Sequence, residues 1–237
     1  MKTDHFEGKS VHEHLKAARA KGALAAAEIH GTEMPGHLSA AADAARDTAV
    51  VLMLHWIILS PKPAVFFLVA AGLFLWKVGR SALLGWARLE RLHRVIEEER
   101  WEIQHAREQE REELAALYQA KGLTGKLLDE VVTVMMADDN RLLNIMLEEE
   151  MGLALEVYEH PLKQSLGAGV GVAIATALFA GGYFFLSPLM GTALTIIIAA
   201  LTVAKLERNR RLEALIWNLS LVGFVAGATY FLKQLFL

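Results

Sequence analysis

Five runs of mainly apolar residues restrict the fold of this 237-residue chain more than any other feature. Crossing about 30 Å of hydrocarbon takes roughly twenty helical residues, and a helix satisfies its own backbone hydrogen bonds in lipid. The most apolar part of the first run is too short to cross alone, and the run reaches this length only with the Ala-rich stretch that precedes that part. We therefore predict an all-α, polytopic membrane protein with five transmembrane helices. The runs cover residues 38–59, 64–84, 166–186, 189–204 and 215–232.

A charged segment separates the second and third runs and predicts an inserted three-helix domain outside the membrane. Ahead of the first run, Ser10 and Glu13 have the spacing of a capping box, which predicts a short surface helix from Val11 to Ile29. Histidines near this helix are typical of scattered surface residues, and we assign them no site. They are His5, His12, His14, His30 and His37. The predicted organisation is a soluble N-terminal segment (1–37), transmembrane helices 1–2 (38–90), a cytoplasmic acidic domain (91–160) and transmembrane helices 3–5 (161–237).

Basic residues lie in the latter half of the second apolar run and directly after the second and fourth runs, and their positions predict the orientation of the chain. Loops rich in Lys and Arg stay in the cytoplasm. With five spans, both basic clusters, the N-terminus and the acidic domain fall on the same, cytoplasmic side of the lipid. Nothing in the sequence indicates nucleic acid as a partner. The clusters are Lys77, Arg80, Arg88, Arg91 and Arg94, and Lys205, Arg208, Arg210 and Arg211.

Four glutamates give the acidic domain its chemistry. No helix-breaking residue interrupts the stretch from Glu97 to Tyr118, which predicts one long helix leaving the membrane. On such a helix the four carboxylates project within about an 80° arc. Like charges at this spacing repel, so bound cations are expected to compensate them. The glutamates are Glu99, Glu102, Glu110 and Glu113.

Two further helices are predicted in the domain, one over residues 126–137 and one from an N-cap at Asp138 or Asp139 towards Tyr158. In the last helix, Met146 and Glu150 are four residues apart and share a face. The chain has no cysteine, so a metal must be held by oxygen, imidazole or thioether groups. A thioether beside carboxylates favours a borderline ion such as Fe²⁺. The alternative is a solvated acidic face above a core filled by methionines.

Several of these segments resemble the vacuolar iron transporter family. The family's paired metal-binding glutamates are similar to the runs Glu99-Arg-Trp-Glu102 and Glu110-Arg-Glu-Glu113. Its Met-Met-x-x-Glu-Leu-Gly-Leu segment is similar to residues 145–153, where Leu147 stands at the position of the second Met. The resemblance implies a homodimer that moves Fe²⁺ or Mn²⁺ against protons; Fe²⁺ is the expected ion, with Mn²⁺ or Zn²⁺ possible. It also implies six metal ligands: Glu99, Glu102, Glu110, Glu113, Met146 and Glu150.

The first two spans depart from the family's pattern. Where family members carry acidic residues in the second span, this chain has Val78 and Trp86, and Ala82 stands at the methionine position. Ionisable residues inside a membrane are functional candidates by default. The candidates for the transport path are therefore those of the first span: Asp43, Asp47 and His55.

Three functions remain open from these patterns. The first is a proton-coupled transporter of divalent metal ions with a cytoplasmic metal-collecting domain. The second is a membrane protein that binds or senses metal without transport, and the third is a structural oligomerisation module. The chain has no P-loop, nucleophile elbow or HExxH motif, so an enzyme is not expected.

Overall fold

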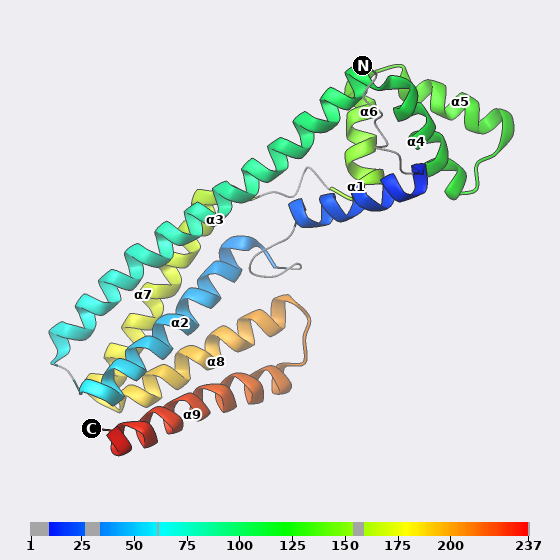
Figure 1. Cartoon of the computed structure of the whole chain (residues 1–237). Coiled ribbons are helices and arrows are strands. Elements are labelled where there is room, and N and C mark those ends of the chain that lie inside the picture. The colour runs from blue at the N-terminus through cyan, green and yellow to red at the C-terminus, as the bar shows by residue number, and fades with distance from the viewer. Residues whose placement is uncertain (1–9, 27–33, 61, 154–158, 237) are drawn as a thin grey trace. The chain divides into compact units, whose positions relative to one another are not determined.

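The computed structural model describes residues 10–26, 34–60, 62–153 and 159–236, and these residues form helices and their connections without any strand. The all-α prediction is therefore confirmed. The chain divides into two compact units, one of residues 1–27 and 87–158 and one of residues 28–86 and 159–237. The helices are α1 (Val11–Ala26), α2 (Gly36–Leu59), α3 (Pro63–His105), α4 (Arg107–Ala120), α5 (Gly125–Met136), α6 (Asp139–Ile145), the π-helical turn η1 (Met146–Glu150), α7 (Pro161–Phe185), α8 (Pro188–Leu206) and α9 (Arg211–Phe236) (Figure 1).

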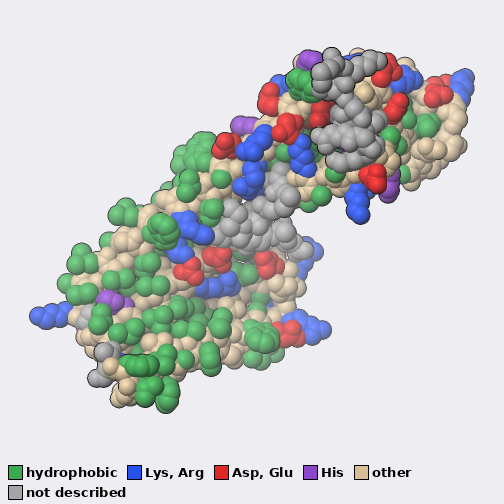
Figure 2. Space-filling view, viewed as in Figure 1, with side chains coloured by type: hydrophobic (Ala, Val, Ile, Leu, Met, Phe, Trp, Pro, Cys, Tyr) green, Lys and Arg blue, Asp and Glu red, His purple; other side chains and the backbone are tan. Residues whose placement is uncertain are grey.

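Four of the described helices are long and apolar enough to cross a membrane, namely α3, α7, α8 and α9. Their large apolar side chains are widely exposed, as at Trp217 and Phe224 of α9, which are 76% and 74% exposed. Figure 2 shows hydrophobic side chains spread over the surface of the second unit, whereas acidic and basic side chains crowd the first. Such a surface is stable in lipid, so the chain is an integral, multi-pass membrane protein.

The predicted first span corresponds to α2, which differs from the other four helices. It has 24 residues, enough for a crossing, but Asp43, Arg46 and Asp47 lie in its first half. Within the second unit α2 packs against α7, α8 and α9 (Figure 1). The count of five spans therefore stays a prediction.

Glycines let α7 approach α2 closely. A Cβ atom on Gly167 would lie 2.0 Å from the carbonyl oxygen of His37, and one on Gly171 would lie 2.1 Å from that of Ala41. This pair has the small-xxx-small spacing that brings membrane helices together. Gly223 and Gly227 of α9 have the same spacing, but a Cβ there would meet no described atom within 4 Å.

In the first unit, α1 is more buried than predicted. The capping box is confirmed, because Ser10 N donates to Glu13 Oε2 (3.0 Å) and Glu13 N donates to Ser10 Oγ (3.3 Å). Leu15 and Ala18 enter a hydrophobic core that also contains Leu114 of α4. The prediction of a surface helix is therefore wrong for this face, which packs against α4 and η1.

Candidate metal centre

A break at Ala106 decides how the predicted glutamates are arranged. The prediction of one helix through Tyr118 is wrong, because α3 ends at His105 and α4 begins at Arg107. Ala106 has φ −123° and ψ 30°, and its NH still donates to the carbonyl of Glu102 (2.7 Å). No Pro or Gly lies here. Beyond the break, the Arg107 guanidinium donates to the carbonyl of Met136 (2.5 Å) and to Asp139 (2.6 Å), and these contacts hold the start of α4 against the α5–α6 connection.

The break sends the glutamates of two helices toward each other. Glu99 and Glu102 lie on α3, whereas Glu110 lies on α4. Each offers a carboxylate oxygen within 4.8 Å of those of the other two. Glu99 and Glu110 are 1% and 0% exposed, and Glu102 is half-buried. These three residues form an all-carboxylate group.

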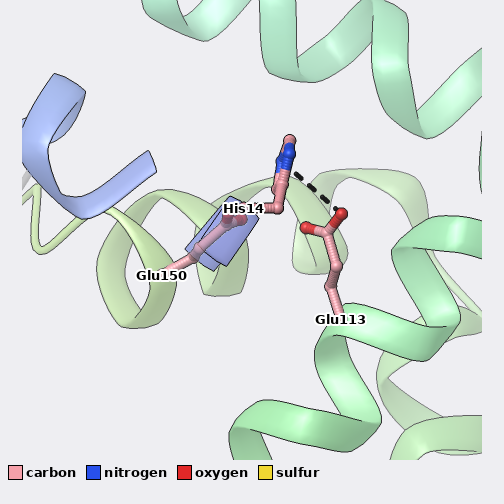
Figure 3. Close-up of side chains that lie close together, drawn as sticks. All are labelled: His14, Glu113 and Glu150. Carbon is pink, nitrogen blue, oxygen red and sulfur yellow. Dashed lines mark ion pairs between the residues drawn. The ribbon is translucent and has the colours of Figure 1, made fainter. Parts of the chain in front are cut away.

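A second group contains a histidine that the sequence analysis left without a role. His14 of α1, Glu113 of α4 and Glu150 of η1 place donor atoms within 4.8 Å of one another (Figure 3). His14 Nε2 lies 3.6 Å from Glu113 Oε1, and the two carboxylates are buried. Leu15, Ala18 and Gly22 recur at helical spacing beside His14, and this pattern is the signal that could have predicted a buried face.

The π-helical turn places Glu150 in this group. Asp138 caps α6 by accepting from Arg141 N (2.8 Å), which confirms the predicted N-cap. The NH of Met151 then donates to the carbonyl of Met146, five residues back (3.2 Å), so the turn is wider than an α-helical one. Of three consecutive glutamates, only Glu150 is buried. The turn therefore selects which carboxylate faces inward.

The helix that contains Met146 is shorter than predicted. It ends at Glu150, and Gly152 follows with φ +68°, a left-handed conformation that favours glycine and closes helices. The prediction of a helix towards Tyr158 is thus wrong at this point, and residues 154–158 lie outside the described residues. Met146 is fully buried in the apolar core of the first unit. A sulfur ligand at Met146 stays a prediction.

The candidates for a transport path lie in the second unit and do not all come together. Asp43 and Asp47 line a cavity of ≈ 400 Å³, together with Lys77 and Arg80. Asp47 pairs with Lys77, and Asp43 pairs with Arg46 at 3.3 Å. His55 does not line the cavity, and its buried Nε2 has no hydrogen-bond partner among the described residues.

The sequence profile of the VIT family matches residues 87–233, more than half of the chain. The chain belongs to the vacuolar iron transporter family. No curated protein and no solved structure matches it. Membership in the VIT family indicates membrane metal-ion transport rather than an enzyme. The matched segment contains all six predicted metal ligands, whereas His14, Asp43, Asp47 and His55 precede it.

Burial sets the protonation of the carboxylates in this VIT chain. Burial, together with the charges of Glu99 and Glu113, raises the pKa of Glu110 to about 10. Burial and the charges of Glu113 and Glu99 raise the pKa of Glu150 to about 9, although Lys21 opposes the shift. Both groups are therefore protonated at neutral pH in metal-free protein. A bound cation must displace these protons, so metal affinity should rise with pH.

The raised pKa values predict how the stability of the metal-free protein depends on pH. The folded state holds these protons more tightly than the unfolded state, whose carboxyls have the ordinary pKa of 4.5. Their contribution to stability is complete below that pKa and is lost as the pH rises through about 9 (Glu150) and about 10 (Glu110). The melting temperature of chelator-treated protein should therefore fall between pH 5 and pH 9.

A double variant provides the control for this measurement. Glu110→Gln with Glu150→Gln removes both titrating groups, so the fall in melting temperature should become much shallower. The assignment is wrong if the double variant keeps the slope of the wild type.

Proposed function

We propose that the chain is a proton-coupled transporter of divalent metal ions, Fe²⁺ or Mn²⁺, with a cytoplasmic domain that collects the ion. The observation that carries the proposal is the convergence of buried carboxylates in the first unit. Glu99, Glu110, Glu113 and Glu150 are each at most 1% exposed. Buried acidic groups are costly unless they are paired or bind metal.

The donor atoms support a divalent ion. Glu150 Oε1 is buried and has no hydrogen-bond partner among the described residues. This oxygen can therefore bind a metal ion in the interior of the unit. Oxygen and imidazole donors suit Fe²⁺, Mn²⁺ and Zn²⁺, and the proposed thioether of Met146 would favour Fe²⁺ among them. The six proposed ligands are Glu99, Glu102, Glu110, Glu113, Met146 and Glu150.

The packing of α1 supports five spans. Because α1 and α4 belong to one compact unit, both lie on the same side of the membrane. The chain between them must therefore cross an even number of times. Since α3 is one crossing, α2 supplies the other, and α7, α8 and α9 bring the total to five. The proposed cytoplasmic orientation follows from the basic residues after α8.

For the membrane path we propose the cavity lined by Asp43 and Asp47. Lys77 pairs with Asp47, so a divalent ion that reaches Asp47 must displace the ammonium group of Lys77. His55 is proposed to lie further along this path. A homodimer stays a prediction that rests on the family resemblance.

Flux into proteoliposomes tests the proposed function. The full chain should carry Fe²⁺ or Mn²⁺ across the membrane when a proton gradient is present, and an ionophore that collapses the gradient should stop the flux. Asp47→Asn should lower the rate at least about ten-fold, because a membrane carboxylate is lost. Asp129→Asn changes an exposed residue of α5 and serves as the matched control. Transport would be contradicted if neither Fe²⁺ nor Mn²⁺ crossed the membrane with the proton gradient in either direction.

The cavity also favours a second function, that of a membrane protein which binds or senses metal without transport. Lys77 and Arg80 place two positive charges beside Asp43 and Asp47, and such charges repel a divalent cation. This function predicts that the full chain in detergent binds Fe²⁺ while the same preparation in liposomes passes none. Binding together with flux would exclude it.

A further inference from the structure

His14 belongs to a helix that is fixed on the first unit by close packing. The capping box begins α1, and Leu15 and Ala18 anchor one face of it in the core. At Gly22, a Cβ atom would lie 2.1 Å from the carbonyl oxygen of Met151. The helix therefore touches the residue that follows Glu150. This contact sets the position of α1 relative to the π-helical turn.

The donor spacing of His14, Glu113 and Glu150 suits a metal ion. Ligands bound to one ion at 2.0–2.2 Å lie roughly 3.0–3.5 Å from one another. The 3.6 Å between His14 Nε2 and Glu113 Oε1 is close to this spacing, and the three donors lie within 4.8 Å (Figure 3). The donors come from three separate elements, α1, α4 and η1, so small shifts of side chains can close the site around an ion.

An ion pair between His14 and Glu113 alone does not explain the arrangement. It would leave Glu150 Oε1 buried with no hydrogen-bond partner among the described residues. A divalent cation would bind both carboxylates and balance their two negative charges. The side chain of His14 is 20% exposed, whereas that of Glu113 is 1% exposed, so the imidazole lies on the solvent side of the group.

We propose that the N-terminal helix supplies a metal ligand, His14, which binds one borderline divalent ion together with Glu113 and Glu150. This inference rests on the proposed metal-collecting role of the first unit and extends it to a residue outside the segment matched by the VIT family. Imidazole gives this position a preference for Zn²⁺ or Fe²⁺ over Mn²⁺ relative to the all-carboxylate group of Glu99, Glu102 and Glu110. Metal binding also fastens α1 to α4 and η1.

Zn²⁺ binding to the purified full chain tests the proposal. In calorimetric titrations, His14→Gln should lose one bound Zn²⁺ or weaken its affinity at least about ten-fold. His12→Gln is the matched control, because His12 is exposed on the same helix, and it should bind as the wild type does. Equal stoichiometry and affinity in wild type and His14→Gln would overturn the proposal.

Hydrogen exchange gives a second readout that a purely structural histidine would not change. Zn²⁺ should slow amide exchange in residues 11–26 of the wild type and of His12→Gln, because the ion joins α1 to the rest of the unit. In His14→Gln this Zn²⁺ effect should disappear. The same slowing in His14→Gln as in the wild type would overturn the proposal.

A third measurement needs no variant. X-ray absorption at the zinc edge of the wild-type protein, loaded with one Zn²⁺ per chain, should show imidazole scattering, and its absence would overturn the proposal.

The outcomes also separate the role of His14 from the proposed collecting domain. Zn²⁺ binding that Glu110→Gln weakens and His14→Gln leaves unchanged would refute the role of His14 but not the collecting domain. If the wild type binds no Zn²⁺, the role of His14 fails, and the collecting domain is then tested by binding of Fe²⁺ or Mn²⁺ to the wild type and to Glu110→Gln.

Discussion

Glu110→Gln should weaken binding of Fe²⁺ or Mn²⁺ by the full chain at least about a hundred-fold and should also raise the melting temperature of the metal-free protein. The loss of affinity follows because Glu110 is fully buried within 4.8 Å of Glu99 and Glu102. The gain in stability follows because glutamine carries no charge to neutralise on folding, whereas burial raises the pKa of Glu110 to about 10. Opposite effects on binding and stability are typical of a binding site rather than of a structural core.

The stabilisation should depend on pH in a defined way. At pH 7.5 the variant should melt a few degrees above the wild type, and at pH 4 the two proteins should melt together, because the unfolded carboxyl is then protonated as well. Glu112→Gln changes an exposed residue of the same helix and should alter neither property. Unchanged metal affinity in Glu110→Gln would contradict a role for the all-carboxylate group.

The second large effect is expected at the contact between α2 and α7. Gly171→Ala should destabilise the second unit by about 3 kcal/mol or more, because the new Cβ atom would lie 2.1 Å from the carbonyl oxygen of Ala41. A backbone oxygen cannot move without shifting α2. The measurements are the yield of monodisperse protein in detergent and its melting temperature.

Gly223→Ala makes the same substitution in α9, where no described atom lies within 4 Å of the new Cβ. Alanine is the better helix former, so this variant should be as stable as the wild type or slightly more stable. Equal loss in both variants would show that helix propensity or insertion, rather than the α2–α7 contact, controls the effect.

Local rules predicted much of the chain correctly. Apolar runs gave the apolar helices α3, α7, α8 and α9, since any segment of that length and hydropathy must bury its backbone polar groups in a helix. The capping residues Ser10 and Asp138 were also predicted, because a cap bonds to a backbone group within three residues and needs no distant partner. Both the family and the identity of the candidate glutamates could be read from short segments.

Distant contacts decided how those glutamates meet. The stretch from Glu97 to Tyr118 contains no helix breaker, yet it breaks at Ala106, where Arg107 binds groups near the start of α6. Local propensity could not predict this break, because the contacts that hold it come from residues about thirty positions later in the chain. The four glutamates that were predicted to share one helix face therefore divide between two groups, with Glu113 apart from the other three.

The sequence by itself determined the family and the candidate carboxylates, which lie at spacings that resemble those of the vacuolar iron transporter family. Only the tertiary structure decided which of them share a site. The π-helical turn selects Glu150 from three adjacent glutamates, and the packing of α1 brings His14 to it across more than a hundred residues of chain. Spacing along one helix defines a face, but a metal site needs donors that converge from several elements, and their convergence depends on packing.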